Sequence, residues 1–162
     1  MEQGKFFIRH LDFYTDGAWS SATDMGGWGL VIVENGEIID TQGGYEPYTT
    51  NNRMELTAIL TALRIIDQID SSRVEVCIIT DSAYCCNALN DRWYVNWLNN
   101  GWKTSDKRDV KNQDLWSEII ALYIKNKKAH NVTIGKVKAH ATDKYNKLAD
   151  KIAVLKRKEL EV

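Results

Sequence analysis

The sequence predicts an α/β protein in which a mixed β-sheet of five strands is flanked by helices. Asn35-Gly36 separates two β-like runs, WGLVIVE (28–34) and EIIDTQGGY (37–45), and such a two-residue connection is the strongest short-range signal of a hairpin. Later strand-like runs alternate with stretches of helical periodicity, and a strand that follows a crossover helix usually lies parallel to the strand before it. The sheet should therefore contain both antiparallel and parallel pairs.

The remaining elements follow from the same patterns. The first strand is expected near residues 6–15, ahead of the hairpin. A long helix is expected from about Asn52 to Asp70, and VEVCIIT (74–80) has the composition of a buried strand bounded by polar residues. The second half of the chain predicts helices at 82–90, 93–98 and 115–124, a polar loop at 99–113, a strand at 132–138 and a last helix at 146–158.

Length and composition fit one domain over residues 1–162, with 44% hydrophobic and 27% charged residues. The chain shows no apolar run long enough to cross a bilayer and no basic leader with an apolar block, so no membrane association is expected. Cys77, Cys85 and Cys86 have neither the pattern of a disulfide framework nor zinc-ligand spacing, which favours a reducing, cytoplasmic setting.

Charge is distributed unevenly along the chain. Residues 1–91 carry 5 Lys/Arg and 14 Asp/Glu, a net charge of −9, whereas residues 92–162 carry 16 Lys/Arg and 8 Asp/Glu, a net charge of +8. The overall charge of −1 argues against a general polyanion binder. The asymmetry suggests a basic face that attracts an anion and an acidic region that holds cations, but a solvated basic surface would show the same counts.

Two carboxylates follow predicted strands. Asp16, in FYTDGAWS, ends the first strand directly before Gly17, and Asp81 ends the strand at 74–80 immediately before a helix. If those strands are parallel neighbours, both side chains lie at the carboxyl-end edge of the sheet, where ligands bind in α/β proteins. Each residue also has a simpler interpretation, because Asp-Gly is a common turn signal and Asp81 is well placed to be a helix N-cap.

Glu55 falls on the apolar side of the first long helix. At about 100° per residue it aligns with Ile59, Ala62 and Ile66, the stripe that should face the sheet. A charged group there is unfavourable unless it is paired or bound to a metal. The alternative is a capping box, with Asn52 as the N-cap and Glu55 three residues later. The two interpretations are compatible, because Glu55 lies in the first helical turn.

The last helix and the loop before it give weaker signals. On the same helical wheel Asp150 lies about 160° from the stripe of Leu148, Ile152 and Leu155, which indicates a solvated residue. His140 stands in a loop, where a lone histidine is usually incidental. Carboxylates that converge at a sheet edge nevertheless suit Mg²⁺, and two such ions can activate water and stabilise the oxygens of a phosphodiester.

The order of motifs along nearly the whole chain resembles the type 1 (bacterial-type) ribonuclease H family. The landmarks are YTDG (14–17), GGWG (26–29), TTNNRMEL (49–56), TDS (80–82), GWKT (101–104), VKNQDLW (110–116), VKAH (137–140) and NKLAD (146–150). The resemblance implies the ribonuclease H-like fold. It also implies an endonuclease that hydrolyses the RNA strand of RNA/DNA hybrids with two metal ions and leaves 5′-phosphate and 3′-hydroxyl ends.

The resemblance assigns the chemistry to five residues. It makes Asp16, Glu55, Asp81 and Asp150 the ligands of two Mg²⁺ ions, with Mn²⁺ as a substitute. The resemblance thus makes Asp150 a metal ligand, although the helical wheel indicates a solvated residue. It makes His140 a mobile-loop residue that assists the attacking water or product release.

The resemblance also implies substrate contacts. Asn51 and Asn52 match positions that contact the RNA strand, where the 2′-hydroxyl distinguishes RNA from DNA. Thr50 matches a contact to a DNA phosphate. The remaining matches form a basic protrusion that holds the DNA strand: Trp93, Trp97, Trp102, Lys103, Lys107, Arg108 and Lys111. For the tryptophans, packing inside the protrusion is at least as good an interpretation as base stacking.

Several positions depart from the family's pattern. Ala22 replaces an asparagine in the loop after the first acid, Val33 stands where a phosphate-pocket arginine is common, and Ala83 stands where glutamine is common. A basic cluster of the protrusion is replaced by Leu98, Asn99 and Asn100. Each change removes a phosphate or RNA contact. We therefore expect a lower affinity for the hybrid and a smaller dependence of binding on salt concentration.

Two other classes of function are possible for such a sequence, a non-catalytic binding module and an enzyme of related fold with another substrate. A non-catalytic module that binds hybrids would lack one of the acids, and none is missing here. Among enzymes of related fold, a junction resolvase or an integrase is disfavoured by TTNNRMEL, and 162 residues are too few for an actin-like phosphotransferase. The expected protein is a cytoplasmic monomer without an obligatory protein partner.

Overall fold

The computed structural model describes residues 9–70, 72–136 and 144–161, and the predicted role of His140 lies outside these residues. No described helix combines the length and apolar character needed to span a membrane. The described elements are β1 (His10–Trp19), β2 (Gly26–Glu34), β3 (Glu37–Glu46), α1 (Asn51–Asp67), β4 (Glu75–Thr80), α2 (Ala83–Asn90), α3 (Trp93–Asn100), α4 (Gln113–Ala129), β5 (Asn131–Lys136) and α5 (Lys144–Leu160).

The strands form one mixed sheet in the order β3-β2-β1-β4-β5. β1 pairs with β2 and β2 with β3 in antiparallel fashion, whereas β1 with β4 and β4 with β5 are parallel. Asn35 and Gly36 connect β2 to β3 with φ values of 53° and 77°, as the predicted hairpin turn requires. The predicted α/β class with a five-stranded mixed sheet is confirmed.

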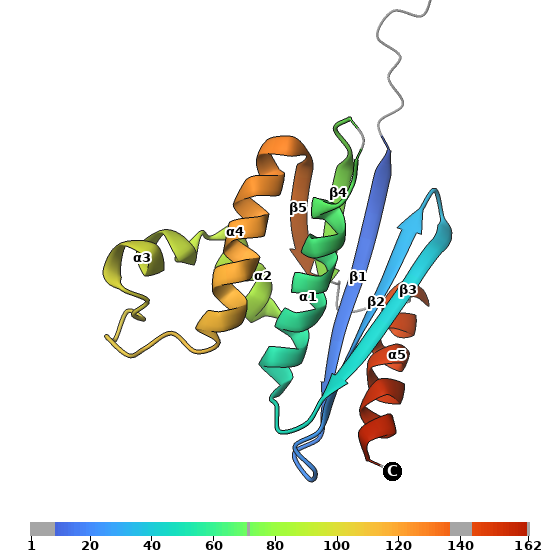
Figure 1. Cartoon of the computed structure of the whole chain (residues 1–162), viewed down its shortest axis with the longest axis horizontal. Coiled ribbons are helices and arrows are strands. Elements are labelled where there is room, and N and C mark those ends of the chain that lie inside the picture. The colour runs from blue at the N-terminus through green and yellow to red at the C-terminus, as the bar shows by residue number, and fades with distance from the viewer. Residues whose placement is uncertain (1–8, 71, 137–143, 162) are drawn as a thin grey trace, which may run out of the picture.

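Helices cover the two faces of the sheet unequally. Figure 1 shows α1 and α4 together on one side of the sheet and α5 on the other, where α5 packs on β1, β2 and β3. The larger core lies under α1 and α4 and includes the fully buried Phe13 and Ile78. A smaller core beneath α5 contains Tyr14 and Val31. Neighbouring residues of β1 thus face opposite cores, as the period of a strand dictates.

β1 does not end at Asp16, so the predictions of a strand end or a turn at this residue are wrong. The strand runs on to Trp19 because β2 continues to pair with it, and Asp16 lies opposite Gly29. The parallel pairing with β4 stops earlier, at Tyr14 and Ile79. Asp16 therefore belongs to a strand that is paired on one side and open on the other, which leaves room beside its carboxylate.

α5 approaches β2 at backbone distance. A Cβ atom at Gly27 would collide with the carbonyl oxygen of Ala153, and one at Gly29 would collide with that of Ala149. Ala149 and Ala153 are fully buried, whereas Leu155 is 53% exposed. Of the apolar stripe predicted for this helix, Leu148 and Ile152 are partly buried against the smaller core, whereas Leu155 is exposed. The closest approach to the sheet is made by Ala149 and Ala153, because glycines on the strand admit the helix backbone.

Candidate active site

Two carboxylates meet where α1 touches β1, and Gly17 makes this contact possible. A Cβ atom on Gly17 would lie 2.7 Å from the backbone nitrogen of Glu55 and 2.9 Å from the carbonyl carbon of Met54. The amide of Gly17 donates to Oδ1 of Asp16 at 2.8 Å and to Oε1 of Glu55 at 3.1 Å. One backbone donor therefore holds both carboxylates side by side.

Glu55 has no capping role. Thr50 is the N-cap of α1, and its hydroxyl accepts a hydrogen bond from the backbone nitrogen of Arg53 at 3.2 Å. The capping box predicted from Asn52 and Glu55 is therefore wrong. Glu55 is only 3% exposed, and its Oε2 atom is buried without a hydrogen-bond partner in the described part of the chain. Such an atom is unfavourable by about 1–3 kcal/mol or more, so it fits a ligand that the chain does not supply.

Asp81 completes a group of three carboxylates. It follows β4, the parallel neighbour of β1, and it is not the cap of α2. That cap is Ser82, whose hydroxyl accepts from the backbone nitrogen of Cys85 at 3.2 Å. One carboxylate oxygen each from Asp16, Glu55 and Asp81 lies within 4.8 Å of the other two. The structure thus brings these three predicted metal ligands together, two of them buried and Asp81 exposed.

Burial and the repulsion between neighbouring carboxylates raise the pKa values of Asp16 and Glu55. Burial, followed by the charge of Asp81, raises the pKa of Asp16 to about 7. Burial, followed by the charges of Asp81 and Asp16, raises the pKa of Glu55 to about 10. Ionising Asp16 and Glu55 together is therefore unfavourable unless a cation joins them. A hard divalent ion with oxygen ligands, such as Mg²⁺, meets this need.

Asp150 lies beside the cluster but outside its closest group. It is exposed on α5 and is not among the three described carboxylates within 4.8 Å of one another. Its charge is close enough to contribute to the raised pKa of Asp16. The packing of α5 explains this proximity, because Ala149 touches Gly29, the residue opposite Asp16 in the sheet. Asp150 is exposed, as the helical wheel predicted, and it also lies near Asp16; its role as a metal ligand stays a prediction of the resemblance.

The predicted RNA contacts lie next to this cluster. Asn51 and Asn52 are the first residues of α1, and both are exposed. Their side-chain amides make no hydrogen bond within the described residues, so they are available to a ligand. The hydroxyl of Thr50 already caps the helix. A contact from Thr50 to a phosphate would have to share that oxygen or use the backbone.

Arg53 is a residue that sequence reasoning missed. Its guanidinium donates two hydrogen bonds to Asp114, at 3.0 and 2.9 Å, and one to Oδ1 of Asn112 at 3.3 Å. Asn112 has a φ of 64°, in the left-handed region. These bonds join the start of α1, with its exposed amides, to the start of α4. Arg53 belongs to the motif TTNNRMEL, and Asn112 and Asp114 belong to the motif VKNQDLW. The presence of both motifs was the one sequence signal that could have indicated this contact.

The three predicted tryptophans pack in one aromatic cluster with Tyr84 and Trp116. The ring centroid of Trp97 lies 5.8 Å from that of Trp102 and 5.3 Å from that of Trp116. The indole nitrogen of Trp116 donates to the hydroxyl of Tyr84 at 2.9 Å. Trp97 is only 7% exposed, so packing accounts for it. Trp93, at 6.3 Å from Trp97, is partly buried and keeps some exposed surface.

The basic residues after α3 are partly neutralised. Lys103 forms an ion pair with Asp109, and the Nε atom of Arg108 lies 3.2 Å from Oδ2 of Asp106. The exposed cations of this segment without an ion pair in the described residues are those of Lys107 and Lys111. These two residues keep the predicted capacity to attract a phosphate backbone.

The departures from the family pattern differ in their structural meaning. Val33 is 3% exposed and belongs to the core beneath α5, so its side chain cannot reach a substrate. The loss of a family phosphate contact at this position stays a prediction. Ala22 and Ala83 are exposed, and Leu98 is 54% exposed. Asn100 and Asn99, which follow Leu98, are exposed too.

Carboxylates clustered at one edge of an α/β sheet, in a chain that also carries a basic segment, are features of a metal-dependent enzyme that acts on a phosphodiester. The RNase H family profile matches residues 9–158. A Ribonuclease H of Caldicellulosiruptor saccharolyticus is 42% identical over 153 residues, which cover 94% of this chain and 99% of that protein. A Ribonuclease H of Chlorobaculum parvum is 44% identical over 149 residues, or 92% of this chain and 96% of that protein.

Solved structures agree with this match. The crystal structure of LC9-RNase H1, a type 1 RNase H, is 27% identical with a TM-score of 0.76, over 95% of this chain and 74% of that chain. LC11-RNase H1, solved in complex with an RNA/DNA hybrid, shares the fold at 16% identity, with a TM-score of 0.69 over 94% of this chain and 99% of that chain. The chain belongs to the ribonuclease H family. The predicted family and enzyme class are confirmed.

Proposed function

We propose that this enzyme hydrolyses the RNA strand of an RNA/DNA hybrid with two Mg²⁺ ions, for which Mn²⁺ can substitute, and leaves 5′-phosphate and 3′-hydroxyl ends. Family membership supports endonucleolytic cleavage of RNA in such hybrids. The observation that carries the metal-dependent mechanism is the cluster of Asp16, Glu55 and Asp81, within which Oε2 of Glu55 is buried and unpaired among the described residues.

Each carboxylate has a distinct part in this proposal. Asp16 and Asp81 would hold metal, while Glu55 and Asp150 would each support one of the two ions. Bound ions in such a site lower the pKa of an attacking water and stabilise both the attacking and the leaving oxygen of the phosphodiester. Asp81 and Asp150 are the exposed members, so they lie on the side from which a substrate approaches.

The protein fixes the geometry of these ligands. The amide of Gly17 orients Asp16 and Glu55 together, and burial of both side chains keeps bulk water from competing for their oxygens. His140 is proposed to assist the attacking water or product release.

Substrate recognition is proposed to follow the same edge of the molecule. The free amides of Asn51 and Asn52 can bond to the 2′-hydroxyls that distinguish RNA from DNA. Lys107 and Lys111, with the exposed surface of Trp93, would hold the DNA strand. Thr50, Lys103 and Arg108 are weaker candidates, because each already bonds within the protein. The single domain, the monomeric state and the cytoplasmic location stay predictions.

The test uses end-labelled RNA/DNA hybrid, duplex RNA and duplex DNA in Mg²⁺, with the wild-type enzyme and with Asp16→Asn. Only the hybrid should be cut, only in its RNA strand, and only by the wild-type enzyme. The downstream RNA fragment should accept a kinase label only after phosphatase treatment. This requirement would identify a 5′-phosphate on that fragment. No hybrid cleavage, or cleavage by Asp16→Asn at the wild-type rate, would overturn the proposal.

A further inference from the structure

We propose that a cavity between α3 and the segment after it binds an unpaired nucleobase of the DNA strand. The enzyme would then favour hybrids whose DNA continues as a single strand beyond the end of the RNA. This inference rests on the proposed function, because it concerns the DNA strand of that substrate.

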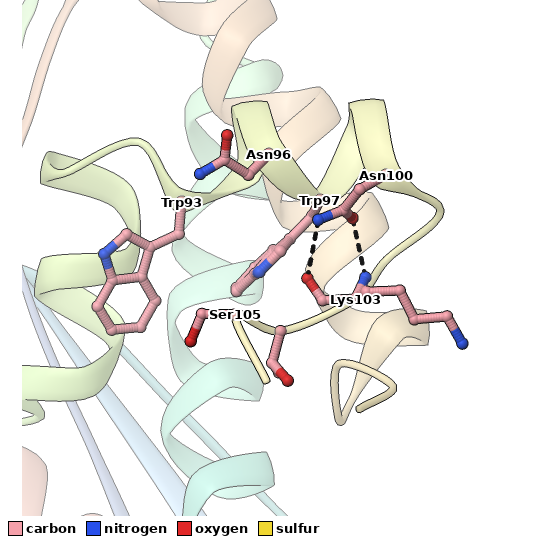
Figure 2. Close-up of a pocket in the computed structure, with 7 residues that line it drawn as sticks. Trp93, Asn96, Trp97, Asn100, Lys103 and Ser105 are labelled. Carbon is pink, nitrogen blue, oxygen red and sulfur yellow. Dashed lines mark hydrogen bonds between the residues drawn. The ribbon is translucent and has the colours of Figure 1, made fainter. Parts of the chain in front are cut away.

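The cavity has a volume of about 360 Å³ and lies in the projection that follows α2. In Figure 2, Trp93 and Trp97 extend from α3, and Ser105 lies across from them on the following segment. Asn96 borders the same space from α3, one helical turn from Asn100. Two indoles and several small polar side chains thus surround one opening.

The walls of the cavity are fixed before any ligand binds. The side chain of Asn100 accepts from the backbone nitrogen of Lys103 at 2.9 Å and donates to its carbonyl oxygen at 3.1 Å. Lys103 is in turn paired with Asp109, and Trp97 is packed against Trp116. A site that is formed in advance needs little ordering when it binds, so its contacts contribute more fully to affinity.

The chemistry of the lining suits a base. An indole offers a flat apolar face for stacking, which tolerates any base sequence. The amide of Asn96 offers a donor and an acceptor, and the hydroxyl of Ser105 offers both as well. Neither side chain makes a hydrogen bond within the described residues. An aromatic peptide side chain would stack equally well but would leave these polar groups unused.

Two arguments indicate that this base comes from single-stranded DNA: the positive charge of the segment and the need for a base that is not paired. Residues 92–111 contain five Lys/Arg and two Asp/Glu, a net charge of +3, which attracts a phosphate backbone. A base inside a duplex is stacked and paired, so it cannot enter a cavity unless it is first extruded. An overhanging DNA strand presents unpaired bases without that penalty.

The test compares cleavage of one labelled hybrid with blunt ends, with a 5′ DNA overhang of thymidines and with a 3′ overhang. At least one overhang should raise kcat/KM by about ten-fold, mainly through KM. Asn96→Ala and Ser105→Ala should each remove most of this gain and leave the kinetics on blunt hybrid unchanged. Asn99→Ala is the matched control, because this exposed α3 residue does not line the cavity.

Two results would overturn the inference: no gain from either overhang, or a gain that survives in the Asn96→Ala, Ser105→Ala double variant. A 5-iodouracil in the overhang should also cross-link to Trp93 in the wild-type enzyme. If blunt hybrid is cut but overhangs have no effect, this inference alone fails. If no hybrid is cut, the proposed function fails, and the fluorescence anisotropy of a labelled oligothymidylate still measures binding to the cavity.

Discussion

Gly17 and Glu55 meet at the contact between β1 and α1. The amide of Gly17 donates to Oε1 of Glu55 across 3.1 Å, and a Cβ on Gly17 would lie 2.7 Å from the nitrogen of Glu55. The position of a proposed metal ligand therefore depends on the packing of a helix against a strand. It also depends on the absence of a single methyl group at that crossing.

Gly17→Ala should reduce hybrid cleavage by at least about 100-fold and lower the free energy of unfolding by about 1–3 kcal/mol. The added methyl group would push α1 from β1 and move Glu55 away from Asp16. Cleavage rate and urea unfolding measure the two effects. Gly135→Ala is the control, because no atom of the described residues lies within 4 Å of a Cβ at Gly135. Wild-type activity in Gly17→Ala would contradict this account.

Asp16→Asn should stabilise the metal-free protein at neutral pH. The pKa of Asp16 is raised to about 7, so the folded state binds this proton more tightly than the unfolded chain does. The wild-type protein therefore loses stability as pH rises from about 4, the unfolded pKa, to about 7. The variant lacks this loss and should be more stable by on the order of 2–4 kcal/mol above pH 7.

Urea unfolding in EDTA at pH 4, 5.5 and 8 measures the effect of Asp16→Asn. The difference in stability between variant and wild type should be small at pH 4 and largest at pH 8. Asp70→Asn, which removes an exposed acid far along the chain, is the matched control. A constant difference across the three pH values would show that Asp16 has no raised pKa.

Cleavage should rise with pH through an acidic midpoint that depends on the Mg²⁺ concentration. Metal ligands must be deprotonated, so protons and Mg²⁺ compete for the carboxylates. If one proton is displaced per ion, each ten-fold increase in Mg²⁺ should lower the midpoint by about one pH unit, until another step limits the rate. Initial rates at several pH values and two Mg²⁺ concentrations give the shift. A pH midpoint that stays the same at both Mg²⁺ concentrations would argue against carboxylate ligands.

Asp150→Asn should lower kcat by about 10- to 100-fold and leave the unfolding midpoint nearly unchanged. Asp150 is exposed, so its loss removes negative charge beside the cluster without opening the core. Cleavage kinetics and thermal unfolding separate the two quantities. Glu159→Gln is the control, since it removes another exposed acid from α5. Equal effects of the two substitutions would show that Asp150 acts only through net charge.

Arg53→Lys should raise KM for hybrid about five- to ten-fold with little change in kcat. Lysine cannot form the paired hydrogen bonds that Arg53 makes to Asp114, so the starts of α1 and α4 would lose their fixed spacing. Arg64→Lys is a close control, because Arg64 makes a similar pair of bonds to Glu118, farther along the same two helices. Both variants should lose about 1 kcal/mol of stability, but only Arg53→Lys should weaken hybrid binding.

Much of the fold was predictable from local patterns, because strands and hairpins have short-range signals. The site was predictable only in part. Glu55 stood out because it is a charge on an apolar stripe. Asp150 did not, because the helical wheel assumes that large apolar residues mark the buried face. Asp150 is exposed as the wheel predicts, and its place near Asp16 follows from the contact of α5 with Gly29, on a strand more than a hundred residues away.

Capping and strand ends were the other errors. Asn52 and Thr50 are both good N-cap residues, and the helix uses Thr50, whose hydroxyl accepts from the backbone nitrogen of Arg53. Asp16 followed by Gly17 has the local pattern of a turn, yet β2 continues to pair beyond it. For the strand end, a pairing partner distant in sequence decided the outcome.

β3 is an edge strand, with one row of backbone groups that no neighbouring strand in the described sheet satisfies. Ile39 is 50% exposed and Tyr45 is 51% exposed, so this edge has the apolar surface that promotes strand-to-strand aggregation. Glu37, Asp40 and Glu46 are spaced along the same strand. Two copies pairing through β3 would bring these like charges together, which discourages self-association at neutral pH. The acids of β3 therefore protect an exposed edge, and replacing them with neutral residues would leave that edge open to strand-to-strand association.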